Sequence, residues 1–402
     1  MAGKLLILVS ITAWCLTGTA QAQISDGVVK IGVLTDMSSL YADLSGQGSV
    51  VAARMAVEDF GAAAKGLKVE IVSADHQNKP DVGSNVARQW FDVDKVDVIV
   101  DVPNSGVALA VNQIVRDKGK AFLDSGAGSS DLTGKACSPN TIHWTYDTWA
   151  LANGTGNAVV KTGGDTWFFL TADYAFGHAL ERDTEAVVLH DGGKVLGKVR
   201  HPLNTADFSS YLLQAQASKA KVIGLANAGG DTTNAIKQAA EFGIVKGGQS
   251  LAGLLVFITD VHSLGLATAH GLFLTESFYW DMNDQTRAFA KRFAERNRGI
   301  YPTMVHAGVY AAVLHYLKAV TALNGDDGTK VIAKMKGLPT DDPLFGKGTV
   351  RADGRKIHNM YLFEVKDPSE SKGPWDLYKL RATIPAAQAF RPLDQGGCPL
   401  VK

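Results

Sequence analysis

The sequence predicts an α/β protein made of two doubly wound lobes. Apolar, strand-like runs alternate with amphipathic, helix-like stretches between residues 28 and 123, and the same alternation restarts after residue 147. Strands that are apolar on both faces and separated by helices belong to parallel sheets that helices cover on both sides. The 402 residues also suffice for two domains of about 150 residues each.

Four strands are expected in the first half of the chain, at 28–34, 69–74, 96–102 and 121–123. The stretches between them, at 48–60, 81–90 and 107–116, are expected to be helices. In the first of these helices Val51, Met55 and Phe60 fall on one face. A right-handed crossover through each helix then gives one doubly wound lobe.

The second lobe is predicted from strands at 167–171, 195–200, 222–226 and 254–258, with helices that begin near Gly177, Phe208 and Asp231. The pattern shifts again around 271–280, and helices are expected at 284–297, 304–323 and 329–335. Near the C-terminus, 348–366 is expected to form a hairpin whose turn is 352–355.

The first residues have the pattern of a cleaved export signal. Lys4 precedes an apolar run from Leu5 to Leu16, and Ala20-Gln21-Ala22 is a small-x-small exit. The run is short of the roughly 20 residues that a membrane-spanning helix needs, so a membrane anchor is the weaker interpretation. We expect residues 1–22 to be a signal peptide, cleaved after Ala22, and the product to be soluble.

Two cysteines, Cys137 and Cys398, remain after that cleavage. In an oxidising compartment they are expected to form a disulfide. The alternative is two thiols buried separately.

Charge and motifs exclude several classes of function. Lys plus Arg and Asp plus Glu each number 40, a balance that argues against nucleic-acid or membrane-surface binding. The sequence has no His-Glu-x-x-His zinc motif, no Gly-x-Ser-x-Gly elbow and no paired-cysteine metal spacing. A dinucleotide-binding fingerprint requires a tight glycine turn directly after the first strand. The glycine pair in Gly46-Gln47-Gly48, which Asp75 follows, lies too many residues after the end of that strand to match it. We therefore expect no enzyme, no cofactor and no metal.

Two loops of the first lobe are suited to an anion. Pro103-Asn104-Ser105-Gly106 and Ser125-Gly126-Ala127-Gly128-Ser129-Ser130 follow expected strands and combine hydroxyls with small residues. Backbone N–H groups at the start of a helix can hold a carboxylate without Arg or Lys. The alternative is ordinary helix capping by Ser105 and Ser129.

Aromatic residues gather where a cleft is expected, and two of them, Tyr41 and Tyr174, follow strands directly. Small-molecule pockets are lined mostly by apolar and aromatic groups with a few placed polar ones. These two tyrosines are therefore expected to contact a solute, whereas packing in the core or hinge is the alternative for the aromatic residues as a group.

Several segments, in order, resemble one family. They are Lys30-Ile31-Gly32-Val33-Leu34-Thr35-Asp36-Met37-Ser38, Ala53-Arg54-Met55-Ala56-Val57-Glu58-Asp59, 125–133, Asp173-Tyr174-Ala175-Phe176-Gly177 and 346–361. The chain resembles the leucine/isoleucine/valine-type periplasmic binding proteins, the solute-binding subunits of branched-chain amino acid ABC importers. The resemblance implies a type I periplasmic binding fold with two Rossmann-like lobes and a three-segment hinge. It places the first lobe at 27–144 plus 279–345 and the second at 147–277 plus 347–395.

The resemblance also implies a site. The family binds a carboxylate at positions matching Ser105, Ala127 and Gly128. Because this chain has Gly128 where the family usually has Thr, Ser129 is expected to supply the hydroxyl. In the second lobe the family supplies a Tyr and then a Glu for a ligand ammonium. Here those loops carry Asn227 and Asp260, and Asp260 is the candidate substitute for the Glu. Asp231 is expected to cap its helix.

The implied function is capture of a small carboxylate-bearing solute in the periplasm by hinge closure. The solute is a branched-chain amino acid or a related aliphatic or aromatic acid, and the absent Glu favours an acid without an α-ammonium. The expected partners are an ABC permease and its ATPase subunits, and the protein itself is expected to be a monomer. The alternative is a periplasmic sensor module that works with a separate signalling partner.

Overall fold

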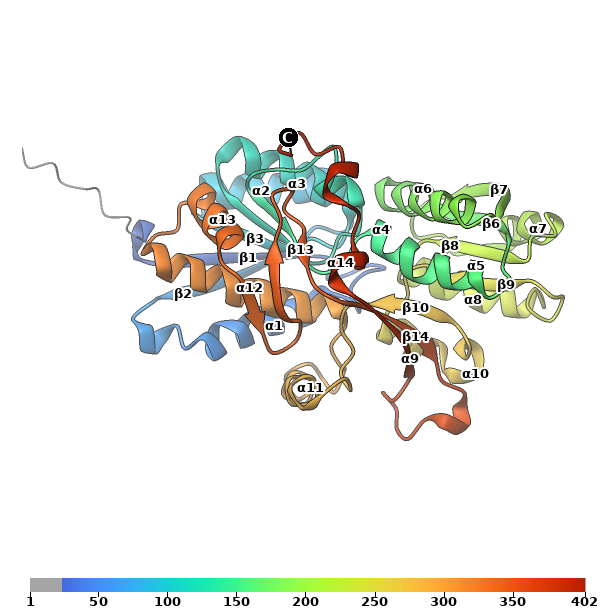
Figure 1. The fold of residues 1–402 in the computed structure, drawn as a ribbon. Coiled ribbons are helices and arrows are strands. Elements are labelled where there is room, and N and C mark those ends of the chain that lie inside the picture. Colours follow the sequence, from blue (N-terminus) through green and yellow to red (C-terminus); the bar gives the residue numbers. More distant parts are fainter. Residues whose placement is uncertain (1–23, 402) are drawn as a thin grey trace, which may run out of the picture.

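The structure is a computed structural model that describes residues 24–401. Two lobes lie side by side, each built around its own parallel sheet (Figure 1). The predicted signal peptide, residues 1–22, lies outside the described residues.

The first lobe contains a five-stranded parallel sheet in the order β2-β1-β3-β4-β5. Its strands are β1 (Val29–Thr35), β2 (Val69–Asp75), β3 (Val98–Asp101), β4 (Ala121–Asp124) and β5 (Thr141–His143). β3 and β4 are buried along their whole length because helices cover both faces of the sheet. One face packs on α1 (Gly46–Phe60), α12 (Met304–Leu323) and α13 (Gly328–Gly337), and the other on α2 (Pro80–Asp92) and α3 (Ser105–Lys118).

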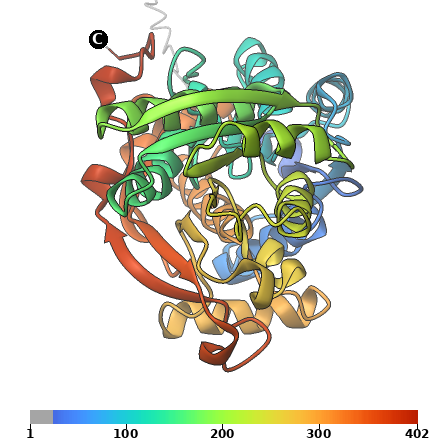
Figure 2. The same cartoon turned by 90° about the vertical axis from the view of Figure 1, so that its right-hand side faces the viewer.

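The second lobe repeats the same winding. Its parallel sheet has the order β7-β6-β8-β9, formed by β6 (Thr166–Ala172), β7 (Lys194–His201), β8 (Val222–Ala226) and β9 (Ser250–Gly253). The helices around it are α6 (Ala175–His190), α7 (Ser209–Ala217), α8 (Gly230–Glu241), α9 (Ile258–Leu264) and α10 (Leu266–Ala269). Figure 2 shows this lobe turned toward the viewer. In both sheets the first strand lies between the second and the third, which is the doubly wound order. The predicted fold class is therefore confirmed.

A third, antiparallel sheet extends the second lobe. It has the order β10-β14-β15, from β10 (Phe273–Glu276), β14 (Met360–Val365) and β15 (Tyr378–Ile384). Leu274, Phe363 and Tyr378 from these strands belong to the same hydrophobic core as β6 and β8. After the chain passes from the first lobe to the second, α4 (Thr148–Leu151), a π-helical turn (Ala152–Gly156) and α5 (Asn157–Lys161) pack on α6. After the chain returns to the first lobe, α11 (Asp284–Arg296) packs on α1.

Between α13 and β14 lie three short strands, β11 (Thr340–Asp342), β12 (Gly346–Val350) and β13 (Lys356–Ile357). β12 pairs with β11 and with β13, and β12 also contacts α13 of the first lobe. The lobe boundary that is expected between 345 and 347 falls within the β11–β12 pair. The exact lobe boundaries stay a prediction.

Most expected elements are present, and the apolar run 254–258 is the main exception. The fourth strand of the second sheet is Ser250–Gly253, so 254–257 is a loop and Ile258 begins α9. Leu254 and Phe257 are nevertheless fully buried. The run is apolar because it is a buried loop at the cleft, which a pattern of hydrophobicity alone cannot separate from a buried strand.

A covalent bond fixes the end of the chain. Cys137 and Cys398, the pair for which the sequence predicts a disulfide, are bonded in the structure. We call residues 385–401 the C-terminal strap. It contains α14 (Ala386–Ala389) and one 3-10 turn (Leu393–Gln395), and it runs from the end of β15 to the first lobe (Figure 1).

His306 connects α12 by a hydrogen bond to the loop that precedes α1. Its Nε2–H donates to the carbonyl of Ser45 (2.8 Å), and its Nδ1 accepts the N–H of Thr303 (3.1 Å). This arrangement requires the neutral imidazole, and burial lowers the pKa of His306 to about 4. The folded protein therefore binds fewer protons here than the unfolded chain between pH 6.5 and 4, so this contribution is complete above pH 6.5 and is lost as the pH falls through that window.

We expect His306→Gln to reveal that loss. The free energy of unfolding of wild type should exceed that of the variant at pH 7, and the gap should narrow by up to about 1.4 kcal/mol per pH unit on acidification toward pH 4. Urea unfolding of both proteins at several pH values measures the gap, because titration of all other groups cancels in the difference. A gap that is constant with pH would contradict the assignment.

No helix within residues 24–401 combines the length and the apolar character that crossing a bilayer requires.

Candidate functional site: the cleft between the lobes

A pocket lies where the carboxyl ends of the two sheets face each other. The first lobe contributes residues from the loops after β1, β3 and β4, and the second contributes residues from just after β6, β8 and β9. The lining residues are Tyr41, Leu44, Pro103, Gly128, Tyr146, Tyr174, Phe176, Ala228, Leu255 and Phe257. Ligands of doubly wound sheets bind beyond the carboxyl ends of the strands, so this pocket is the candidate site.

Five of the ten lining residues are aromatic, and none carries a charge. Tyr41 from the first lobe and Tyr174 from the second meet across the pocket, with 2.5 Å between their hydroxyl oxygens. Burial raises the pKa values of Tyr41 and Tyr174 above the usual tyrosine value, so both phenols stay neutral. The pocket can therefore surround the apolar body of a solute and donate hydrogen bonds to a polar group that the solute carries, but its walls supply no charged partner.

The lobes are close together around this pocket. The free volume is about 10 Å³, roughly that needed for a single water molecule. The N–H of Gly230 donates to the carbonyl of Leu40 (3.3 Å), and Ser130 donates its hydroxyl to Asp183 (2.7 Å), so contacts join the lobes on both sides. A solute of several atoms enters only when these contacts part and the lobes open.

The two predicted anion-binding loops touch each other. The N–H of Ser129 donates to Oγ of Ser105 (3.2 Å), and both residues are fully buried. Capping of α3 falls to Asn104, whose Oδ1 accepts the N–H groups of Gly106 (2.9 Å) and Val107 (3.1 Å). Ser105 is therefore not the cap, and its hydroxyl hydrogen is left to donate elsewhere. Ser129 does cap a short 3-10 turn, through the N–H of Asp131 (3.4 Å).

Three carbonyl groups of the second loop are engaged by hydrogen bonds within the protein. Those of Gly126, Ala127 and Gly128 accept from Tyr146 Oη (2.6 Å), His143 Nε2 (2.7 Å) and the Thr148 N–H (2.7 Å). This arrangement removes repulsive carbonyl oxygens from a site that is to hold an anion.

One predicted donor of this loop is already in use. The Ala127 N–H donates to Oδ1 of Asp124 (2.9 Å), as does the Gly126 N–H (3.2 Å). The Gly128 N–H makes no hydrogen bond to any described residue. Of the two amides predicted from the sequence, only that of Gly128 is therefore available to a ligand.

The backbone before the first loop is strained. Asp101 and Val102 both have positive φ, at 81° and 61°. Left-handed backbone is rare outside glycine, and for a β-branched residue such as Val102 it is a marked outlier. Strain of this kind costs about 1–3 kcal/mol per residue and persists only where the surrounding structure enforces it.

Two carboxyl groups lie buried beneath the loops. Burial raises the pKa of Asp101 to about 7, and it raises that of Asp124 well above the usual aspartate value. In its protonated form such a carboxyl group is neutral and does not repel an anion bound above it.

Asn227 and Asp260, two of the three residues predicted from the second lobe, do not line the pocket, whereas Tyr174 does. Asn227 is fully buried, and its side chain bonds to Thr232 (2.6 Å) and His201 (3.1 Å). Asp260 accepts the N–H of Phe257 (2.9 Å) at the start of α9. Their neighbours Ala228 and Phe257 form the pocket wall instead.

The expectation that Asp231 caps its helix is wrong. α8 begins at Gly230, so Asp231 already lies in the first turn, and its oxygens accept the N–H groups of Asn204 (3.1 Å) and Thr205 (2.9 Å). The side chain fixes a neighbouring loop rather than the end of its own helix.

Sequence reasoning missed one buried acid near the cleft. Glu276 ends β10, is 1% exposed, and accepts a hydrogen bond from Tyr378 (3.2 Å). Burial first, and then the charge of Asp260, raise the pKa of Glu276 well above its usual value. Neither acid is part of the pocket lining. Glu276 and Tyr378 are brought together only by the sheet in which β14 pairs with β10 on one side and with β15 on the other, so no local pattern could have indicated their contact.

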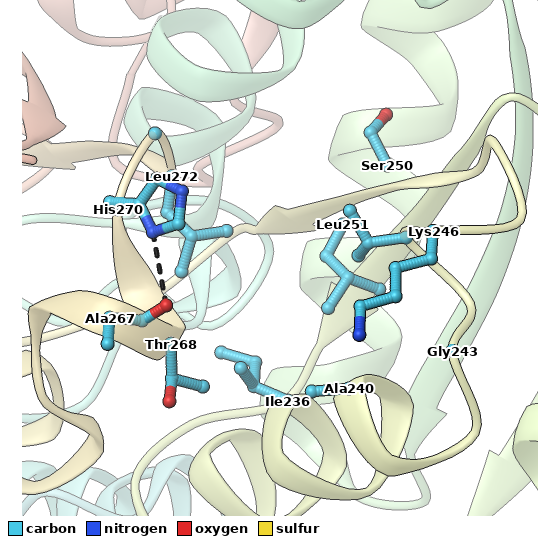
Figure 3. Close-up of a pocket in the computed structure, with 12 residues that line it drawn as sticks. Ile236, Ala240, Gly243, Lys246, Ser250, Leu251, Ala267, Thr268, His270 and Leu272 are labelled. Carbon is cyan, nitrogen blue, oxygen red and sulfur yellow. Dashed lines mark hydrogen bonds between the residues drawn. The ribbon is translucent and has the colours of Figure 1, made fainter.

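A larger hollow of about 440 Å³ lies elsewhere on the second lobe (Figure 3). It is bordered by the end of α8, by α10 and by Ser250 and Leu251, which begin β9. It is therefore at the amino end of the sheet, away from where ligands of this fold bind. Its wall is mainly aliphatic, and the Nδ1 of His270 bonds to the carbonyls of Leu266 (3.2 Å) and Ala267 (3.1 Å). We do not assign the site here.

No group of three or more His, Cys, Asp and Glu side chains in the described part of the chain is arranged to hold a metal ion.

A profile for the periplasmic binding proteins matches residues 28–374, which is most of the chain. The chain belongs to the periplasmic binding protein family. Proteins of this family bind solutes, and the recognition made from the sequence is therefore confirmed.

Two solved structures of this family are similar over nearly the whole chain. A periplasmic binding protein from Burkholderia mallei is 54% identical, with a TM-score of 0.91, over 94% of this chain and 100% of that one. A branched chain amino acid ABC transporter periplasmic ligand-binding protein from Burkholderia xenovorans LB400 is 44% identical, with a TM-score of 0.81, over 93% and 100%. The Leu/Ile/Val-binding protein homolog 6 of Brucella melitensis is 23% identical, over 89% of this chain and 92% of its own length.

Proposed function

We propose that this periplasmic binding protein captures a small carboxylate that has an apolar body and no ammonium group, and delivers it to an ABC permease. The observation that carries the proposal is the pocket wall, which has five aromatic residues and no acidic or basic one. A buried ammonium without an anionic partner costs several kcal/mol, so an amino acid is disfavoured.

The carboxylate is proposed to bind at the two loops of the first lobe. Ser105 and Ser129 offer hydroxyl hydrogens, Gly128 offers an N–H group, and the loop carbonyls are engaged elsewhere. Tyr41 and Tyr174 would pack against the body of the solute. Ala127, Asn227 and Asp260 would not bond to the solute, because their polar atoms already form hydrogen bonds within the chain, and they would instead support the residues that do.

The proposed cycle is one of binding and release, without a chemical step. Solute binds to the first lobe while the cleft is open, the second lobe closes over it, and the closed pair of lobes is recognised by the permease, whose ATPase subunits drive transport. Closure excludes water and strengthens the hydrogen bonds to the carboxylate. We further propose export with cleavage after Ala22 and action as a monomer.

Paired ligands test the absence of an ammonium partner. Leucine and 4-methylpentanoate share a side chain and a carboxylate but differ in the ammonium, and phenylalanine and 3-phenylpropanoate form a second such pair. We expect the acids to raise the melting temperature of the mature protein and the amino acids to leave it unchanged. A ligand at 100 times its Kd stabilises by about 2.7 kcal/mol.

The reverse result would contradict this assignment. If leucine binds and 4-methylpentanoate does not, an acidic group pairs with the ammonium, and Asp260 and Glu276 are the residues to substitute first.

A further inference from the structure

The C-terminal strap connects the two lobes. It leaves β15, whose residue Tyr378 belongs to the core of the second lobe, and it ends at the disulfide to Cys137, which follows the 3-10 turn after the 125–130 loop of the first lobe. The disulfide therefore closes a fourth connection between lobes that the main chain already joins three times (Figure 1).

Midway along, the strap covers the hinge. The ring of Phe390 lies 4.5 Å from the guanidinium of Arg355, and that guanidinium donates to the carbonyl of Tyr146 (2.9 Å). Tyr146 lines the pocket and holds the carbonyl of Gly126. The strap thus contacts the layer of residues that directly supports the 125–130 loop.

The next residue of the strap reaches that loop itself. Arg391 donates to the carbonyl of Ser130 (3.1 Å), and its own carbonyl is held by Arg351 (2.8 Å). Ser130 follows Ser129 directly, and its N–H donates to Thr148 (3.1 Å) while its hydroxyl donates to Asp183 of the second lobe (2.7 Å). One residue therefore carries contacts from the strap, from the hinge and from the opposite lobe.

Hydrophobic packing stabilises the strap only weakly. Its one α-helix, α14, has four residues, and the buried strap residues are Ala389, Phe390 and Cys398. A segment with so few buried apolar contacts opens easily on its own. A covalent anchor raises the effective concentration of Arg391 at the loop, since a tethered contact re-forms intramolecularly.

We propose that Arg391 is a positioning residue for the 125–130 loop, and that the Cys137–Cys398 disulfide keeps it in place. The strap thereby restricts the motion of the 125–130 loop and makes the conformation of this loop depend on the relative position of the lobes. The proposal does not depend on which solute binds, so failure of the solute assignment would leave it intact.

Hydrogen exchange of the mature protein without ligand tests it. The probes are the N–H groups of Ser129 and Ser130, which donate to Ser105 and Thr148. In Cys137→Ser/Cys398→Ser we expect both to exchange roughly tenfold faster, about the factor that loss of one hydrogen bond gives, while the amides of β1 keep their rates. Faster exchange in the strap alone, with Ser129 and Ser130 unchanged, would overturn the proposal.

Substitutions at Arg391 keep the disulfide intact, so they separate the positioning effect of Arg391 from the stability that the disulfide provides. They also test the proposal if the Cys137→Ser/Cys398→Ser variant does not fold. Arg391→Ala should accelerate exchange at Ser129 and Ser130, and Arg391→Lys, which retains a donor for the carbonyl of Ser130, should restore the slower rates. Arg381→Ala is the matched control, because Arg381 lies on β15 and bonds to Glu364 at the surface. Acceleration by the control, or none by Arg391→Ala, would refute the assignment.

Discussion

Arg355→Met is expected to lower the free energy of unfolding by about 3–5 kcal/mol, the range for removing one partner of a buried ion pair. Arg355 is fully buried at the hinge, 3.5 Å from Asp147, and its guanidinium donates to the carbonyls of Tyr146 (2.9 Å) and Lys356 (3.1 Å). Burial lowers the pKa of Arg355 to about 10, so the group remains charged at pH 7. Its removal leaves the Asp147 carboxyl without its charged partner and two carbonyls without their donor.

Urea unfolding at pH 7 measures the change, and two further variants interpret it. Arg355→Met with Asp147→Asn removes the charge on both sides, keeps a side-chain oxygen to cap α4, and should recover part of the loss. Lys221→Met breaks an exposed pair with Asp165 and should cost at most about 1 kcal/mol. Equal effects of Arg355→Met and Lys221→Met would show that the hinge pair contributes no more than a surface pair.

Ser105→Ala is expected to weaken binding of the preferred carboxylate by about 1–3 kcal/mol, which corresponds to roughly 5- to 150-fold in Kd. The variant removes a hydroxyl that donates to the solute in the proposed complex and that also accepts the N–H of Ser129. Calorimetric titration of wild type and variant with the acid that gives the larger thermal shift measures the difference.

Ser138→Ala is the control for this second prediction. Ser138 is buried in the same lobe and accepts a backbone N–H, that of Asn140, at the same distance of 3.2 Å, but it lies outside the two loops that are proposed to hold the carboxylate. Its substitution should leave Kd unchanged. An unchanged Kd for Ser105→Ala as well would place the carboxylate elsewhere in the cleft.

Elements with a strong local signal could be predicted closely from the sequence. The helix expected at 304–323 has those bounds in the structure, because Thr303 caps its first turn and Asn324 ends it in a left-handed conformation. The fourth strand of the second sheet could not be placed, because its neighbouring loop is as apolar as a strand. Leu255 and Phe257 of that loop are buried by the cleft, which exists only once both lobes are assembled.

The candidate site was predictable to a similar extent. Tyr41, Gly128 and Tyr174 follow strands and do line one pocket. Asn227 follows a strand and Asp260 lies in the first turn of α9, yet each turns its polar atoms to partners within the second lobe. Sequence position alone does not tell which way a side chain turns. Tyr146 enters the pocket from the hinge. It is one of the aromatic residues that gather where the cleft is expected, but the sequence alone does not separate a ligand contact from packing in the hinge.

The left-handed backbone at Asp101 and Val102 means that the proposed site can form only after the sheet around it has folded. Nothing in the local sequence favours that conformation; it is held by neighbouring strands, through bonds from the Val102 N–H to the carbonyl of Leu34 (2.9 Å) and from the Ser125 N–H to that of Asp101 (3.3 Å). The turn toward Ser105 is thus imposed by the finished sheet and would relax in an excised peptide. In the export that we propose, a chain kept unfolded for passage across a membrane would carry every residue of the proposed site without its affinity, and the affinity would arise in the compartment where folding is completed.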